Sequence, residues 1–96
     1  MAQDGLQYST PMTATSTGVS ASFGFRAHYV NLINDTTSQA AFADLTGAVA
    51  TSSASFKLPA AGGTTGPLYQ TANAFWAGFS SKTSDGSATI RVLALG

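Results

Sequence analysis

The sequence predicts an all-β protein, a small antiparallel β-sandwich or barrel of about six to eight short strands. Apolar residues beyond residue 21 recur with a period of two, which is the period of a strand with one buried face. Groups of Gly, Pro, Asn and Asp interrupt these runs about every 8–15 residues, as expected of turns between strands. No long stretch has the period of 3.6 residues that is typical of an amphipathic helix.

The chain has 96 residues, enough for one domain with a modest core. It contains no cysteine, so neither a disulfide nor a thiolate metal site can stabilise that core. Small domains without such cross-links often gain stability from partner subunits. We therefore expect a homo-oligomer.

The charge content is unusually low. Charged residues make up 8% of the chain, against roughly 25% in ordinary soluble domains, and there is no glutamate. Ser and Thr together number 25, so hydroxyl groups supply most of the polar surface. A chain of zero formal net charge has little self-repulsion and associates readily. Its four Lys and Arg residues are too scattered to neutralise a run of phosphates, so we expect no nucleic-acid partner.

The N-terminal segment, residues 1–20, is rich in Thr, Ser and Ala. We expect it to be an extended arm in front of a β-domain of residues 21–96. Its first ten residues, MAQDGLQYST, have neither the basic start nor the apolar core of a signal peptide, which predicts synthesis in a cytoplasm without a secretion signal. No apolar run approaches the ~18–20 residues that cross a bilayer, so we expect no membrane contact.

The clearest alternation begins at residue 22. One face carries the apolar and aromatic side chains Phe23, Phe25, Ala27 and Tyr29. The opposite face carries Ser22, Gly24, Arg26 and His28. Val30 and Leu32 then place apolar groups on this second face, which indicates either a bulge or burial on both sides.

The middle of the chain alternates short apolar runs with segments rich in turn residues. In order, we expect a turn at 34–37, a strand at 39–45, a loop at 46–53, a half-buried strand at 54–58, a loop at 59–67 and a short strand at 68–71.

The end of the chain predicts a hairpin of two strands, residues 74–80 and 87–95. Asp-Gly, at the end of the connection 81–86, is a strong turn dipeptide. We expect Phe75 and Phe79 to share the inward row of the first strand.

His28 is the only histidine and has Arg26 beside it on the same strand face. A metal ligand or a general base needs partners, and the chain offers neither a second histidine nor a cysteine. We interpret Arg26 and His28 as lying on the solvent-exposed face of a strand whose aromatic face is buried. A cleft that brought His28 next to Asp44 would reopen an enzymatic reading.

No catalytic set is evident elsewhere. The four aspartates are isolated in sequence, two of them in turns where Asp is a structural choice. No G-x-S-x-G element is present, and a lone histidine leaves little scope for a triad. We expect no enzyme, no cofactor and no metal.

Trp76 follows Phe75 in the run FWAGF, so Trp76 faces outward if Phe75 and Phe79 face inward. An outward Trp76 could stack on a sugar, insert into a neighbouring subunit or cover an edge of the core. Tyr8 and Tyr69 are amphipathic contact residues of the same kind. The candidate interface residues are Tyr8, Arg26, His28, Tyr69 and Trp76.

Strands and turns follow a definite order over about three quarters of the chain. The segments are YVNLIND (29–35), AFADLTG (41–47), AVATSS (48–53), FKLPAAGG (56–63), FWAGF (75–79) and ATIRVLALG (88–96). This order of strand, Asn turn, Ala/Thr/Ser loop, Pro/Ala/Gly loop and closing aromatic strands resembles a loose group of small all-β virion proteins of tailed bacteriophages.

The resemblance implies a structural role in the virion: capsid decoration as a cement protein, or a tail, neck or head-fibre accessory. It supplies no catalytic residues. The expected partners are the major capsid protein or another virion protein, and further copies of the chain, with a trimer expected. A different class stays open, a carbohydrate- or receptor-binding β-module in which Trp76 and Tyr69 stack on the ligand.

Overall fold

The computed structural model describes residues 6–46, 50–51, 55–70 and 74–96, and every regular element within these ranges is a strand. The all-β prediction is confirmed. The strands are β1 (Gln7–Tyr8), β2 (Met12–Thr15), β3 (Val19–Ala27), β4 (Tyr29–Asn34), β5 (Ala41–Asp44), β6 (Phe56–Leu58), β7 (Leu68–Tyr69), β8 (Trp76–Thr83) and β9 (Ser87–Leu95).

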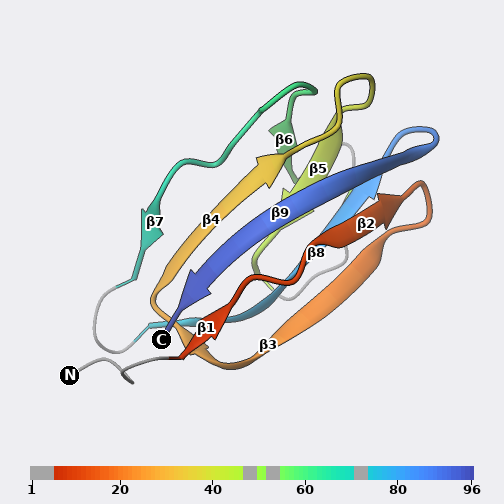
Figure 1. Ribbon diagram of the computed structural model, residues 1–96. Coiled ribbons are helices and arrows are strands. Elements are labelled where there is room, and N and C mark those ends of the chain that lie inside the picture. The colour runs from red at the N-terminus through yellow and green to blue at the C-terminus, as the bar shows by residue number, and fades with distance from the viewer. Residues whose placement is uncertain (1–5, 47–49, 52–54, 71–73) are drawn as a thin grey trace.

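The strands form one sheet that curls into a half-barrel (Figure 1). Its strand order is β6-β5-β8-β2-β9-β4-β7, with β1 also paired to β9 and β3 also paired to β8. β2 and β8 run parallel, so the sheet is mixed rather than purely antiparallel as expected. β6 and β7 are the two ends of this order, and the curled sheet is not closed between them. We call the opening between β6 and β7 the seam.

The predicted hairpin of the last two strands is wrong. The turn itself is present, with Gly86 at a φ of 71° directly after Asp85. Beyond the turn, however, β2 lies between β8 and β9, with Thr15 opposite Lys82 of β8 and Met12 opposite Ile90 of β9. Consecutive strands usually pair, and here the N-terminal segment takes the place between them.

Part of the predicted N-terminal arm therefore belongs to the sheet. Residues 7–20 form β1, β2 and the start of β3. They are extended, as expected, but β2 pairs with strands on both sides and is not separate from the body. The reason is that Met12 and Ala14 are buried while Thr13 between them is exposed, a strand pattern that the composition of the segment masks. Residues 1–5 lie outside the described ranges.

The change of apolar face after residue 29 results from a corner in the chain. β3 ends at Ala27 and β4 begins at Tyr29, so His28 lies between two strands. The His28 backbone N–H donates to the Leu95 carbonyl (2.9 Å), and its carbonyl accepts from the Gln70 N–H (2.9 Å). The corner directs the apolar faces of both strands to one core. Its buried apolar residues are Met12, Ala14, Phe23, Ala27, Val30, Leu32, Ala41, Ala43, Leu58, Phe79, Ala88, Ile90, Val92 and Ala94.

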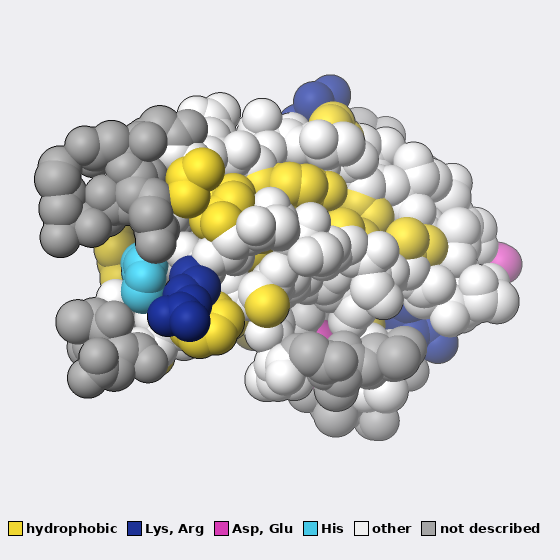
Figure 2. All heavy atoms as spheres, turned by 90° about the horizontal axis from the view of Figure 1, so that it is seen from below, with side chains coloured by type: hydrophobic (Ala, Val, Ile, Leu, Met, Phe, Trp, Pro, Cys, Tyr) yellow, Lys and Arg dark blue, Asp and Glu magenta, His cyan; other side chains and the backbone are white. Residues whose placement is uncertain are grey.

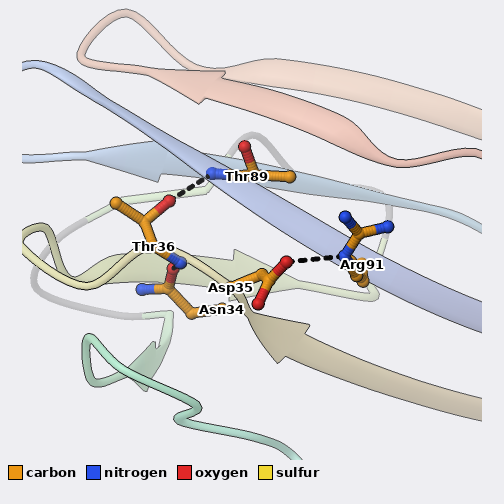
Figure 3. Close-up of polar contacts among 5 residues, drawn as sticks. All are labelled: Asn34, Asp35, Thr36, Thr89 and Arg91. Carbon is orange, nitrogen blue, oxygen red and sulfur yellow. Dashed lines mark hydrogen bonds and ion pairs between the residues drawn. The ribbon is translucent and has the colours of Figure 1, made fainter.

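The predicted turn after β4 is present and joins this strand to β9 (Figure 3). The Asp35 backbone N–H donates to the Thr89 carbonyl (2.8 Å), and the Thr89 N–H donates to the Thr36 hydroxyl (2.7 Å). The Asp35 carboxylate pairs with Nε of Arg91 at 2.7 Å. Backbone and side-chain contacts thus fix the end of the half-barrel that lies opposite the corner at His28.

Asn34 links this turn to the seam. Its side chain is fully buried, and Nδ2 donates to the carbonyls of Gln39 (2.7 Å) and Leu58 (3.1 Å). Oδ1 accepts from the Thr36 backbone N–H at 3.1 Å, the geometry of an Asx turn. One amide therefore connects β4, the following turn and β6.

Candidate interaction surface

The structure brings the predicted interface residues to one end of the half-barrel, around the corner between β3 and β4. Tyr29 lies opposite Leu95 of β9 and Tyr69 of β7, and Ala27 lies opposite Trp76 of β8. Figure 2 shows the histidine at this end beside a cationic side chain and next to apolar side chains. We call Arg26, His28, Tyr29, Tyr69 and Phe75 the aromatic end.

Arg26 lies over the ring of Phe75, with 5.1 Å between the guanidinium carbon and the ring centroid. Such a cation–π contact orients the guanidinium and contributes about 0.5–1 kcal/mol at an exposed site. The only ion pair in the described part of the chain joins Arg91 to Asp35, so Arg26 has no described carboxylate within ion-pair distance. Phe75 therefore orients these donors, and no carboxylate in the described ranges pairs with them.

Two tyrosines lie beside this contact region. Tyr69 packs edge-on against Tyr29, with 5.2 Å between the ring centroids. Tyr69 is 73% exposed, although aromatic side chains bury large areas when they are covered. The pair offers a rigid aromatic surface at the end of a short strand.

Trp76 and Tyr8 are placed differently from the other candidates. Both are partly buried against the core, and the Tyr8 ring lies 5.4 Å from that of Phe23. Of the three readings of Trp76, covering the edge of the core is the one that its packing fits. Phe75 is instead 44% exposed, so its expected inward position is wrong. Phe75 precedes β8, which begins at Trp76, and it lies next to the irregular part of the pairing of β3 with β8, between Ser22 and Ala27.

Phe75 is the contact residue that the sequence reasoning missed. The signal was the doublet of Phe75 and Trp76, which requires one ring to face outward. Alternation gives two solutions for such a doublet, and the local pattern does not decide between them.

Asp44, which had no assigned role, is held by its own loop. Its Oδ1 accepts from the Thr46 hydroxyl and from the Thr46 backbone N–H (2.7 Å), and Oδ2 accepts from the Ser55 hydroxyl (3.3 Å). The Thr46 hydroxyl, and then its N–H, hold the pKa of Asp44 below the ordinary value of 3.8. No described hydrogen bond or ion pair joins Asp44 to His28.

A hollow of about 300 Å³ opens at the seam. Four polar residues, Asp44 among them, contribute to its wall. Its apolar lining consists of Leu32, Ala43, Leu45, Phe56 and Leu68. The hollow therefore combines inner-face side chains of β4 and β5 with residues from the two ends of the sheet.

Comparisons with protein families, with curated proteins and with solved structures find no match for this chain. The site must therefore be interpreted from its own geometry.

That geometry places exposed aromatic rings and a cationic side chain together at one end of the half-barrel. Within the described ranges, no three His, Cys, Asp or Glu side chains are grouped closely enough to hold a metal ion. The same ranges contain no helix with the length and hydropathy of a membrane span. What the surface does offer is an exposed aromatic end, whose arginine has no acidic partner among the described residues, and an apolar hollow at the seam.

Proposed function

We propose that this chain is a structural protein of a tailed-bacteriophage virion, a capsid decoration (cement) protein without enzymatic activity. Its copies dock on the major capsid protein or another virion protein and associate with one another, as a trimer in the simplest arrangement. The chain thus acts at the virion, where it stabilises the particle by adding contacts between its subunits.

The aromatic end is the observation that supports this proposal most directly. Arg26 over Phe75 and Tyr69 against Tyr29 place Arg and exposed aromatic rings together. Tyr and Arg are the residue types most enriched among the side chains that dominate protein–protein binding energy. An exposed cluster of this kind is the surface expected of a protein that binds another protein.

The low charge of the chain supports a role in a repeating assembly. Contacts made by apolar area keep their strength across salt concentrations, whereas exposed ion pairs are screened. An end of the molecule measuring 22 by 18 Å gives only a small contact for each copy. Many such contacts made by linked copies add through multivalency.

The decisive experiment compares particles assembled with and without the protein. We expect particles that lack it to lose infectivity at lower temperature and to break more readily on osmotic shock. Cryo-electron microscopy of the same particles distinguishes capsid decoration from a tail, neck or head-fibre position. Particles of unchanged stability, in which mass spectrometry also detects no copy of the protein, would contradict the proposal.

A carbohydrate-binding module is the second candidate, and the exposure of Tyr69 favours it. The ring is 73% exposed and held by Tyr29, an arrangement that suits stacking on a sugar ring. Trp76 is less suited to this role because it packs against the core. Binding on a glycan array that is lost in Tyr69→Ala would support this candidate, and an array without any bound glycan would exclude it.

A further inference from the structure

Phe56 has an unusual position at the seam. It lies on the same face of β6 as Leu58, which is fully buried, and it is opposite Ala43, which is also buried. Its side chain therefore faces the inner side of the curled sheet, yet it is 57% exposed. In the described part of the sheet, no strand covers β6 on the side of the seam. An inward-facing aromatic ring left uncovered indicates that another molecule completes this side.

The hollow next to Phe56 has the size and lining for a bulky apolar side chain. Its volume is about 300 Å³, and Leu32, Leu45 and Leu68 contribute to its wall. A second hollow of similar volume lies over β3 and β8, but its lining is mainly Ser, Ala and Gly, and its one aromatic residue, Phe79, is buried. Of these two hollows, the one at the seam combines an exposed aromatic side chain with an apolar wall.

The dimensions of the molecule favour a broad contact along its length. The half-barrel measures 41 × 22 × 18 Å. A standard interface buries about 800 Å² on each partner, which a side of 41 by 22 Å can supply and an end of 22 by 18 Å cannot. A self-association that is stable in solution therefore requires a side, and the seam is a side on which a hollow adjoins an exposed aromatic side chain.

Charge complementarity points to a second copy as the occupant. Phe56 is followed by Lys57, which is exposed, and the wall of the hollow includes Asp44. The hydrogen bonds from Thr46 favour the ionised carboxylate of Asp44. The edge strand β6 thus exposes an aromatic side chain on one face and a cationic side chain on the other, whereas the hollow beside it is apolar and anionic. Both belong to the same side of the molecule, so copies of the chain can complement one another.

We propose that copies of this chain associate through the seam, with Phe56 of one copy covering the hollow of another and Lys57 approaching its Asp44. This inference rests on the self-association in the proposed function and identifies its surface. The seam then binds further copies, and the aromatic end is left free for a different virion protein.

The test is the oligomeric state of the full chain, measured by sedimentation equilibrium and native mass spectrometry. The wild type should have the mass of two or more chains of 9.7 kDa each. Phe56→Ser should raise the dissociation constant about 10- to 100-fold, because an exposed ring that is buried only in the oligomer is lost. Phe75→Ser is the matched control, since it removes an exposed ring at the aromatic end and should leave the dissociation constant unchanged.

Lys57→Glu provides a second measurement that leaves the apolar contact in place. It should weaken association about five-fold at low salt and less at high salt, because the ion pair is exposed. Lys82→Glu, which makes the same charge change on β8, should have no such effect.

A monomeric wild type at millimolar concentration would overturn the proposal, and so would a Phe56→Ser variant that keeps the wild-type dissociation constant. A small molecule retained at the seam by the monomer in native mass spectra would also overturn it. Binding of the Phe56→Ser monomer to particles is measured separately. If that binding persists, the proposed virion function stands even if the seam does not mediate self-association. Failure of one proposal is therefore distinguishable from failure of the other.

Discussion

Gly78 approaches Ala21 so closely across the pairing of β3 with β8 that a Cβ at Gly78 would lie 2.2 Å from the Ala21 carbonyl oxygen. No real Cβ tolerates such a contact with backbone, so the two strands would have to separate. We expect Gly78→Ala to lower the free energy of unfolding by about 1–3 kcal/mol, the usual cost of forced overpacking. Urea unfolding followed by tryptophan fluorescence measures this change.

Gly24→Ala separates the effect of steric overlap with an added Cβ from the effect of the left-handed backbone conformation. Gly24 has a φ of +80°, but a Cβ there would meet nothing within 4 Å. Its substitution should cost about 1–2 kcal/mol through the left-handed conformation alone. A Gly78→Ala variant with wild-type stability would show that β3 and β8 are not as close as the structure has them.

Removing the amide of Asn34 should destabilise the seam. Asn34→Ala would leave the carbonyls of Gln39 and Leu58 and the N–H of Thr36 without their partner in a buried site. We expect a loss of about 2–4 kcal/mol in the free energy of unfolding, since each unsatisfied buried group costs about 1–3 kcal/mol and the site relaxes in part.

Asn31→Ala is the matched control for this measurement. Asn31 accepts a hydrogen bond from the Thr64 hydroxyl (3.0 Å) at an exposed position, where water replaces the lost partner. The expected cost is below about 1 kcal/mol. Equal losses in the two variants would mean that burial of Asn34 does not matter.

The lowered pKa of Asp44 predicts a dependence of stability on pH. Because the folded state lowers the pKa below the ordinary 3.8, this carboxylate stabilises the fold above that value and stops doing so as the pH falls through the lower folded pKa. The wild type should be more stable than Asp44→Asn at neutral pH, and the difference should shrink in acid. The Asp44 midpoint, followed by carboxyl NMR, should rise in Thr46→Ala because the leading hydrogen bond is lost. A midpoint that does not move would contradict the assigned cause.

The faces of the strands and the positions of the turns could be predicted from the sequence, because strand alternation and turn chemistry depend on residues that are close in the sequence. The row of Phe23, Phe25 and Ala27 and the turns at Asn34 and Asp85 follow directly from such patterns. Which strands pair with one another could not be predicted in this way. The position of β2 between β8 and β9 depends on the burial of Met12 and Ala14, and their small strand is difficult to recognise in a segment rich in Thr and Ser.

The candidate site was predictable in part for the same reason. Arg26, His28 and Tyr69 could be chosen because they are polar-tipped or amphipathic residues at the ends of apolar runs. Phe75 and Phe56 could not, since alternation assigns both to inward rows. Both exposed rings lie at long-range features: Phe75 precedes β8 beside its irregular pairing with β3, and Phe56 lies at the seam, which no strand crosses in the described part of the sheet.

The two arginines of the chain test whether the aromatic end binds a partner on the particle. Both are exposed, but Arg91 is already paired with Asp35, whereas Arg26 is oriented by Phe75 and has no described acidic partner. We expect Arg26→Gln to raise the dissociation constant for particles stripped of the protein about 10-fold, as for an arginine central to an interface. Arg91→Gln should leave that constant unchanged while lowering the free energy of unfolding by no more than about 1 kcal/mol, the usual range for an exposed ion pair. If the two variants bind particles equally well, the contact with the particle lies elsewhere, because Arg26 belongs to the aromatic end and Arg91 lies at the opposite end of the half-barrel.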